Sequence, residues 1–158
     1  MSNSRVPAID AARALAILRI ALGALFLSTF FENLHKELYS AKGYAGLIGY
    51  YIQSGHAPAA WKQVMGLMAA HAAIAGPMQA VLESSLGILL IIGLLSRPAA
   101  LVAFGFLTGL WLSEWGIGWY WELLMPMIVA VSVVIGPSGD CMAVDVALRQ
   151  RWPHFVIW

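Results

Sequence analysis

The sequence predicts an all-α integral membrane protein, a four-helix bundle with an additional amphipathic helix in a long outer connection. Hydrophobic residues make up 61% of the 158 residues and charged residues only 11%, against roughly 25% charged residues in a soluble globular domain. Four apolar stretches each approach the ~20 residues that cross a hydrocarbon core, at residues 14–34, 77–95, 98–115 and 121–136. We therefore expect residues 1–158 to form a single domain without a separate soluble catalytic domain.

The boundaries of the spans follow from single residues. The first apolar run begins after Arg13 and is long enough to stay in the membrane, so we expect no cleavable signal peptide. Gly76 and Pro77 are predicted to end the outer connection and to start the second span, since proline is tolerated in the first turn of a helix. Pro126 predicts a kink in the fourth span.

Glycines predict where the spans approach one another. Gly23 lies in the first span and Gly87 in the second, and Gly105 and Gly109 form a small-x-x-x-small pattern in the third. Such residues let helix backbones come close in a membrane. We therefore expect helix contacts at these positions.

The outer connection has two halves. In residues 40–58, glycines alternate with tyrosines, which indicates irregular backbone at a membrane surface. In residues 59–75, apolar side chains recur at spacings of three and four, which predicts a helix; they are Trp61, Val64, Met65, Met68 and Ala72. We expect this amphipathic helix to lie at the mouth of the bundle.

Basic residues predict the topology. If the chain crosses the membrane four times, both termini share a side with the link between the second and third spans. The basic residues on that side are Arg5, Arg13, Arg97, Arg149 and Arg151, and those on the opposite side are Lys36, Lys42 and Lys62. The positive-inside tendency then predicts a multi-pass protein of a bacterial-type inner membrane with both termini in the cytoplasm.

Ionisable residues within the spans mark the candidate site. They are Arg19, Glu32, Glu83, Glu114 and Glu122. A charge at the centre of a spanning helix costs about 2.5–3.5 kcal/mol on insertion scales, so such residues have partners or face a wet cavity. The acids are expected to gather toward the outer membrane face, whereas Arg19 lies near the cytoplasmic face.

Glu83 is the candidate catalytic residue, and two interpretations of it stay open. It forms either a buried tether to Arg19 or Lys36, or a carboxyl group that exchanges protons with a quinone headgroup. Arg19, Glu114 and Glu122 are candidate ligand-binding residues, although the long side chain of Arg19 favours snorkelling to headgroups or contact with an anionic lipid.

Trp111 and Trp115 are the aromatic candidates for quinone binding. They belong to a cluster of aromatic residues that also includes residues 119–121. A belt of aromatic residues at the membrane interface is the commoner cause of such a cluster. A pocket for a flat lipid-soluble ligand is the alternative, and both can hold at once.

Other functional classes receive little support. Cys141 is the single cysteine and has no partner for a disulfide or a zinc site. The four histidines are scattered and do not predict a metal site, and haem ligation by His71 is a minor alternative. A net charge of +1 gives no reason to expect nucleic acid.

Three short patterns resemble the DoxX family of membrane proteins. The first is residues 18–26 around Arg19, the second runs from Glu83 to the Gly-Leu-Leu-Ser-Arg sequence ending at Arg97, and the third is residues 136–139 followed by Asp145. The resemblance implies a four-helix membrane protein of the group that includes DoxX and the DoxD subunit of thiosulfate:quinone oxidoreductase. It also implies that Arg19, Glu83 and Arg97 are family-like polar residues.

The resemblance implies a small subunit of a larger membrane complex with quinone-linked redox chemistry. The expected partners are other integral-membrane subunits, lipids and quinone, with no intrinsic cofactor. If the chain takes part in catalysis, it does so as a subunit of a quinone-dependent oxidoreductase. The alternatives are a non-catalytic scaffold subunit and a small transporter of protons or a solute.

Overall fold

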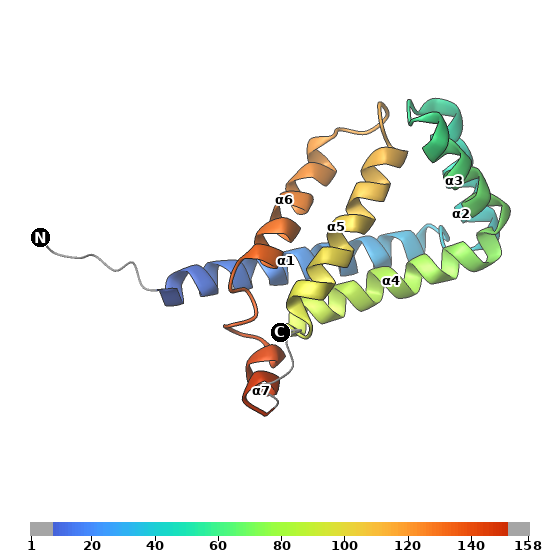
Figure 1. The fold of residues 1–158 in the computed structure, drawn as a ribbon. Coiled ribbons are helices and arrows are strands. Elements are labelled where there is room, and N and C mark those ends of the chain that lie inside the picture. Colours follow the sequence, from blue (N-terminus) through green and yellow to red (C-terminus); the bar gives the residue numbers. More distant parts are fainter. Residues whose placement is uncertain (1–7, 152–158) are drawn as a thin grey trace, which may run out of the picture.

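The computed structural model describes residues 8–151, which form seven helices and no strand (Figure 1). The helices are α1 (Ala8–His35), α2 (Ala41–Ser54), α3 (Ala59–Ala70), α4 (Ala72–Ile92), α5 (Ser96–Ser113), α6 (Trp121–Ile135) and α7 (Val144–Arg151). The predicted all-α class is confirmed.

Two helices within residues 8–151 are long and apolar enough to cross a membrane. They are the Ala11–His35 part of α1, with 25 residues, and α4, with 21 residues; α6 is a shorter apolar helix. Large hydrophobic side chains on α1 and α4 point away from the core, among them Ile17, Phe31, Met78 and Val81. Exposed apolar surface on this scale is typical of a protein whose surroundings are lipid.

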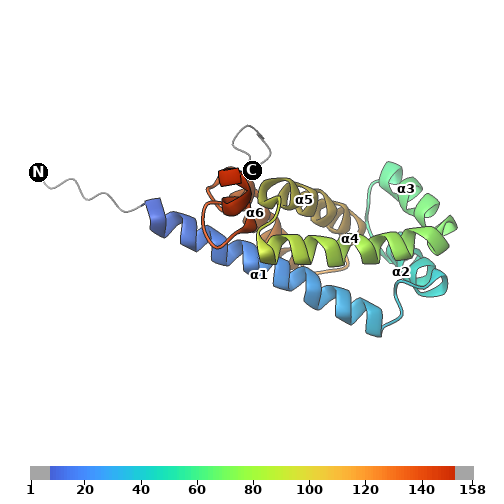
Figure 2. The same ribbon diagram turned by 90° about the horizontal axis from the view of Figure 1, so that it is seen from below.

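The main helices form two pairs that cross each other. α1 packs along α4, and α5 packs along α6 (Figures 1 and 2). α6 also contacts α1, and α4 contacts α5. The shared core consists of buried leucine, alanine and aromatic side chains from all four helices, including Phe26, Leu90 and Ala130.

The α2–α3 pair connects the start of α4 with the end of α5, so the three pairs are arranged as the sides of a triangle (Figure 1). Trp61 Nε1 on α3 donates to Ser113 Oγ at 3.0 Å. The backbone N–H of His56, between α2 and α3, donates to the carbonyl oxygen of Trp115 at 2.7 Å. These contacts hold the outer connection against the α5–α6 loop.

Glycine allows α1 and α4 to lie close together. A Cβ atom added at Gly23 would lie 2.8 Å from the carbonyl oxygen of Gly87 and 2.9 Å from the backbone nitrogen of Ile91. Both neighbours are backbone atoms and cannot turn aside. The expected contact at Gly23 and Gly87 is therefore present, whereas a Cβ at Gly105 would meet nothing within 4 Å among the described residues.

The prediction of irregular backbone for residues 40–58 is wrong. Most of the segment forms α2, which begins after Ser40, whose hydroxyl accepts a hydrogen bond from the N–H of Gly43 at 3.0 Å. Tyr44 and Ile48 on one face of α2 are buried against α3 and α4. This packing outweighs the low helix propensity of the glycines.

The predicted boundary at Gly76 and Pro77 is also wrong. The break falls at His71, and α4 begins at Ala72, so Pro77 lies inside α4. Gly76 has a packing role, because a Cβ there would lie 2.4 Å from the carbonyl oxygen of Tyr39. Glycine at this position allows the segment that follows α1 to lie close to α4.

Alanine substitutions at two glycines test the packing of α1 on α4. We expect Gly23→Ala to destabilise the protein by about 1–3 kcal/mol, because the added methyl group meets backbone atoms. Gly105→Ala is the matched control and should leave stability unchanged or slightly raised, since its methyl group enters open space and alanine favours helix. Thermal unfolding in one detergent compares the two, and equal effects would contradict the proposed close contact.

Candidate functional site

Glu83 on α4 is 1% exposed, and within residues 8–151 the groups that donate hydrogen bonds to it are neutral. Gln79 Nε2 donates to its Oε1 at 2.7 Å, Asn33 Nδ2 donates to its Oε2 at 3.2 Å, and the Tyr39 hydroxyl also donates to Oε2. The ring of Phe30 stacks on that of Tyr39, with centroids 5.7 Å apart. Side chains from α1, α4 and the segment after α1 thus fix the carboxyl group.

Of the two interpretations of Glu83, the tether to a cation is wrong. No lysine, arginine or histidine lies within salt-bridge distance of Glu83 in the part of the chain that the structure describes. Lys36 pairs with Glu32 on the surface instead. Glu83 is therefore buried among neutral donors.

Glu114 follows directly after α5 and has a tyrosine partner of its own. The Tyr51 hydroxyl, on α2, donates to Glu114 Oε1 at 2.7 Å. Burial, and then the hydrogen bond to Glu114, raises the pKa of Tyr51. Burial and the hydrogen bond to Glu83 raise the pKa of Tyr39 in the same way. Both phenols therefore keep their protons at neutral pH and act as donors.

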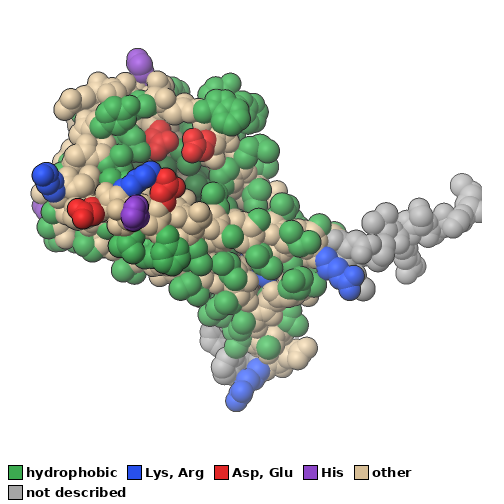
Figure 3. Space-filling model, turned by 180° about the vertical axis from the view of Figure 1, so that it is seen from behind, with side chains coloured by type: hydrophobic (Ala, Val, Ile, Leu, Met, Phe, Trp, Pro, Cys, Tyr) green, Lys and Arg blue, Asp and Glu red, His purple; other side chains and the backbone are tan. Residues whose placement is uncertain are grey.

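Three acids from different parts of the chain line one cavity. Glu83, Glu114 and Glu122 border a cavity of about 160 Å³ between α1, α4, α5 and α6, and the rest of its lining is largely hydrophobic. Figure 3 shows the molecule from behind, relative to Figure 1. The acidic side chains visible in this view gather at the end of the molecule that carries α2 and α3. The structure therefore brings together three of the predicted site residues.

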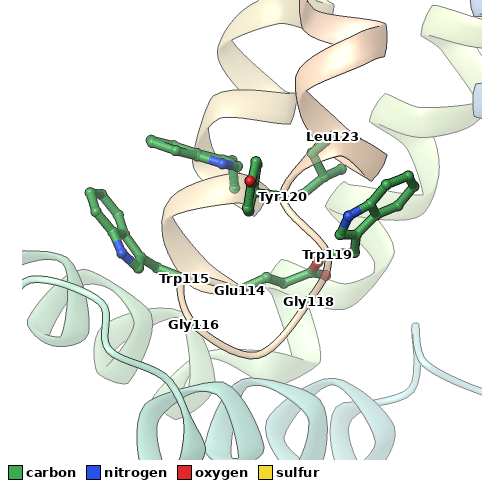
Figure 4. A pocket seen from close by; sticks show the side chains of 8 residues that line it. Glu114, Trp115, Gly116, Gly118, Trp119, Tyr120 and Leu123 are labelled. Atoms are coloured by element: carbon green, nitrogen blue, oxygen red, sulfur yellow. The ribbon is translucent and has the colours of Figure 1, made fainter.

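A second cavity, of about 250 Å³, is formed by the end of α5 and the α5–α6 loop (Figure 4). Trp111, Glu114 and Trp115 line it, and the two indole rings lie 4.9 Å apart. Glu114 borders this cavity as well as the acid-lined one. Trp119 also lines it, although its side chain is 70% exposed. The cluster thus combines a pocket wall with outward-facing rings that suit a membrane interface.

Arg19 does not join this site. It is fully buried beside the C-terminal end of α4 and the start of α5, whereas Glu83 lies near the middle of α4. Its Nη1 donates to the carbonyl oxygen of Ser138 at 2.9 Å and to Ser96 Oγ at 3.2 Å, and its Nη2 donates to the carbonyl oxygen of Met142 at 2.6 Å. The expected snorkelling of Arg19 is therefore wrong, because the guanidinium group holds the chain that follows α6.

Asp145 completes the polar cluster around Arg19. It is 1% exposed, and its carboxylate accepts hydrogen bonds from the backbone N–H groups of Leu95 and Ser96, at 2.7 and 2.8 Å. These groups belong to the start of α5, so an acid in α7 caps a helix that begins 49 residues earlier. Arg97, the other family-like residue, is exposed in the first turn of α5.

Sequence reasoning missed three residues of these clusters. Tyr39 and Tyr51 belong to the connection between the first and second spans, for which the sequence predicts no site role, and Asp145 enters only through the resemblance to DoxX. Their partners lie 44, 63 and 49 or 50 residues away in the sequence. Contacts at such separations carry no local spacing pattern. Only Asp145 carried a signal in the sequence, because it is an acid that shortly follows the glycine-rich residues 136–139.

The fold and its cavities define a class: a small helical membrane protein with an acid-lined cavity near one end. The family model named DoxX matches residues 14–114, which is more than half of the chain and extends from α1 to Glu114. The chain belongs to the DoxX family. No curated protein and no solved structure matches it. The third pattern of the resemblance, residues 136–139 and Asp145, lies beyond the matched range.

Replacement of Asp145 tests its capping role. We expect Asp145→Asn to destabilise the protein by about 2 kcal/mol, because an amide offers only one acceptor oxygen, so that one backbone N–H at the start of α5 loses its partner and meets an NH₂ group instead. Asp140→Asn is the matched control nearby. Asp140 forms an exposed ion pair with Arg149, and such pairs contribute little. Unfolding in detergent measures both variants, and an Asp145→Asn protein as stable as its control would contradict the assignment.

Proposed function

We propose that the chain is a small integral-membrane subunit of a quinone-linked redox complex, and that it contacts a quinone headgroup at the acid-lined cavity. The observation that supports this most is the convergence of Glu83, Glu114 and Glu122 on one hydrophobic cavity. Pockets with mostly apolar walls and a few placed polar groups are typical of small-molecule sites. Membership of the DoxX family agrees with this function.

The chemistry proposed for these residues is proton exchange. Reduction of a quinone to a quinol consumes two electrons and two protons, and the reverse reaction releases them. Glu83 and Glu114 supply or take up the protons, because carboxyl groups within hydrogen-bond reach act as general acids and bases. Tyr39 and Tyr51 hold the two carboxyl groups in place. The adjacent rings of Trp111 and Trp115 offer faces for stacking against a flat headgroup.

The electrons in this proposal come from a redox partner subunit. Other integral-membrane subunits are therefore expected partners, together with lipids. Exposed apolar side chains on α5, those of Leu101 and Val102, support such an interaction. The same observation favours a second candidate function, a non-catalytic scaffold subunit that docks through α5 without binding quinone.

The proposed location is a bacterial-type inner membrane with both termini in the cytoplasm and the acid-lined cavity toward the outer face. Charge distribution supports this orientation. Arg97 and Arg149 lie at the end of the molecule that contains the Arg19 cluster, whereas Lys36 and Lys62 lie at the other end, near α2 and α3. Arginine-rich ends tend to remain on the cytoplasmic side.

Replacement of Glu83 tests the proposed function. We expect Glu83→Gln to weaken the binding of a water-soluble quinone at least tenfold, because glutamine keeps the shape of the side chain but cannot exchange a proton or accept equally strong hydrogen bonds. Quenching of tryptophan fluorescence in the purified protein measures binding, since Trp111 and Trp115 line the second cavity, which shares Glu114 and Leu123 with the acid-lined one.

Glu32→Gln is the matched control, because Glu32 is exposed and pairs with Lys36 outside the cavity. Its affinity should equal that of the natural protein. Equal quinone binding by both variants would rule out a role for Glu83 in binding, whereas no binding even by the natural protein would leave the scaffold function as the better one.

A further inference from the structure

An apolar groove lies on the side of the central helices where α2 and α3 pack against α4. It has a volume of about 770 Å³ and is lined by α2, α3, α4 and α5, almost wholly by hydrophobic atoms. Met78 and Val81 on its α4 side are each 65% exposed. In a membrane, exposed side chains of this kind face lipid, so the groove opens toward hydrocarbon.

One polar group in this groove has no partner. The Tyr44 hydroxyl is buried and makes no hydrogen bond within residues 8–151, and the whole side chain is 1% exposed. Tyr44 lines the groove from α2. A buried hydroxyl without a partner destabilises a protein. Such a group, at the wall of a cavity, points to a ligand that accepts its hydrogen bond.

The groove continues inward toward the acid-lined cavity. Tyr44, Gln79 and Phe106 line both the groove and a smaller hollow of about 230 Å³. Phe106 and Leu110 then line both this hollow and the cavity of Glu83, Glu114 and Glu122. Gln79 also donates its amide N–H to Glu83. The three spaces therefore form a series from the lipid-facing surface to the acids.

We infer that the groove holds the hydrocarbon chain of the quinone whose headgroup lies at the acids, and that the Tyr44 hydroxyl donates to one ring carbonyl. The inference rests on the proposed function. A quinone fits because its two carbonyl oxygens lie on opposite sides of the ring, so that one can face Tyr44 and the other the acids. A phospholipid fits poorly, because a phosphate group needs cationic or several N–H partners and no basic side chain is among the described residues that line the acid-lined cavity.

The experiment compares two quinones with the same ring, one without a side chain and one with a decyl chain. Affinities are measured by tryptophan quenching for the full chain in lipid nanodiscs. The natural protein should bind the decyl form at least tenfold more tightly, because each buried methylene contributes about 0.8 kcal/mol. Val81→Phe should remove this gain by narrowing the groove, without changing the affinity for the ring alone.

Tyr44→Phe should weaken both quinones about fivefold, in line with the loss of one hydrogen bond. It should not lower stability, because it removes an unpartnered hydroxyl. Two matched controls should behave as the natural protein. Tyr50→Phe removes an exposed hydroxyl from α2, and Ile88→Phe enlarges an exposed side chain two turns further along α4, outside the groove.

The outcomes separate this inference from the proposed function. If the decyl chain of the quinone adds no affinity, or if Val81→Phe and Ile88→Phe change the affinity for the decyl quinone equally, the inference is overturned. Glu83-dependent binding of the quinone ring alone would still support the proposed function. If Val81→Phe removes the gain while Glu83→Gln changes nothing, the groove binds a chain but the headgroup site is wrong. If neither quinone binds, both proposals fail.

Discussion

The requirement that buried polar groups find partners within the protein determines much of this structure. In hydrocarbon there is no water to satisfy an exposed donor or acceptor. The two terminal nitrogens of Arg19 meet the requirement by donating to the carbonyl groups of Ser138 and Met142, although its Nε has no partner within residues 8–151. The carboxyl group of Asp145 meets it by accepting from the N–H groups at the start of α5. These bonds attach the chain after α6 to the opposite end of the bundle from the acid-lined cavity.

The two buried polar clusters solve the same problem in different ways. Around Arg19 and Asp145 most partners are backbone groups, which are fixed by helix ends and turns. Around Glu83 every partner is a neutral side chain, and the carboxyl group borders a cavity. A charge held by backbone is suited to holding helices together. A carboxyl group held by side chains next to an open space is suited to exchanging protons with a ligand.

The sequence was sufficient for properties that depend on composition and on runs of apolar residues. It predicted the all-α class, helices close to the expected spans, and the concentration of acids toward one end. It did not predict α2, because the stability of that helix comes from burying Tyr44 and Ile48 rather than from local propensity. It assigned Arg19 to the lipid surface, because its partners, such as Ser138, lie 119 residues away. Long-range contacts of this kind leave no periodic signal.

The position of a bound headgroup is the most direct test of the central claim. A quinone with a photoreactive group on its ring would be bound to the protein in nanodiscs and illuminated, and the labelled residues would be identified by mass spectrometry. We expect label on the segments of α4 and α5 that carry Glu83 and Glu114, and its loss when excess unlabelled quinone competes. Label confined to the exposed rings of Trp119–Trp121, or label that competitor does not displace, would contradict the proposed site.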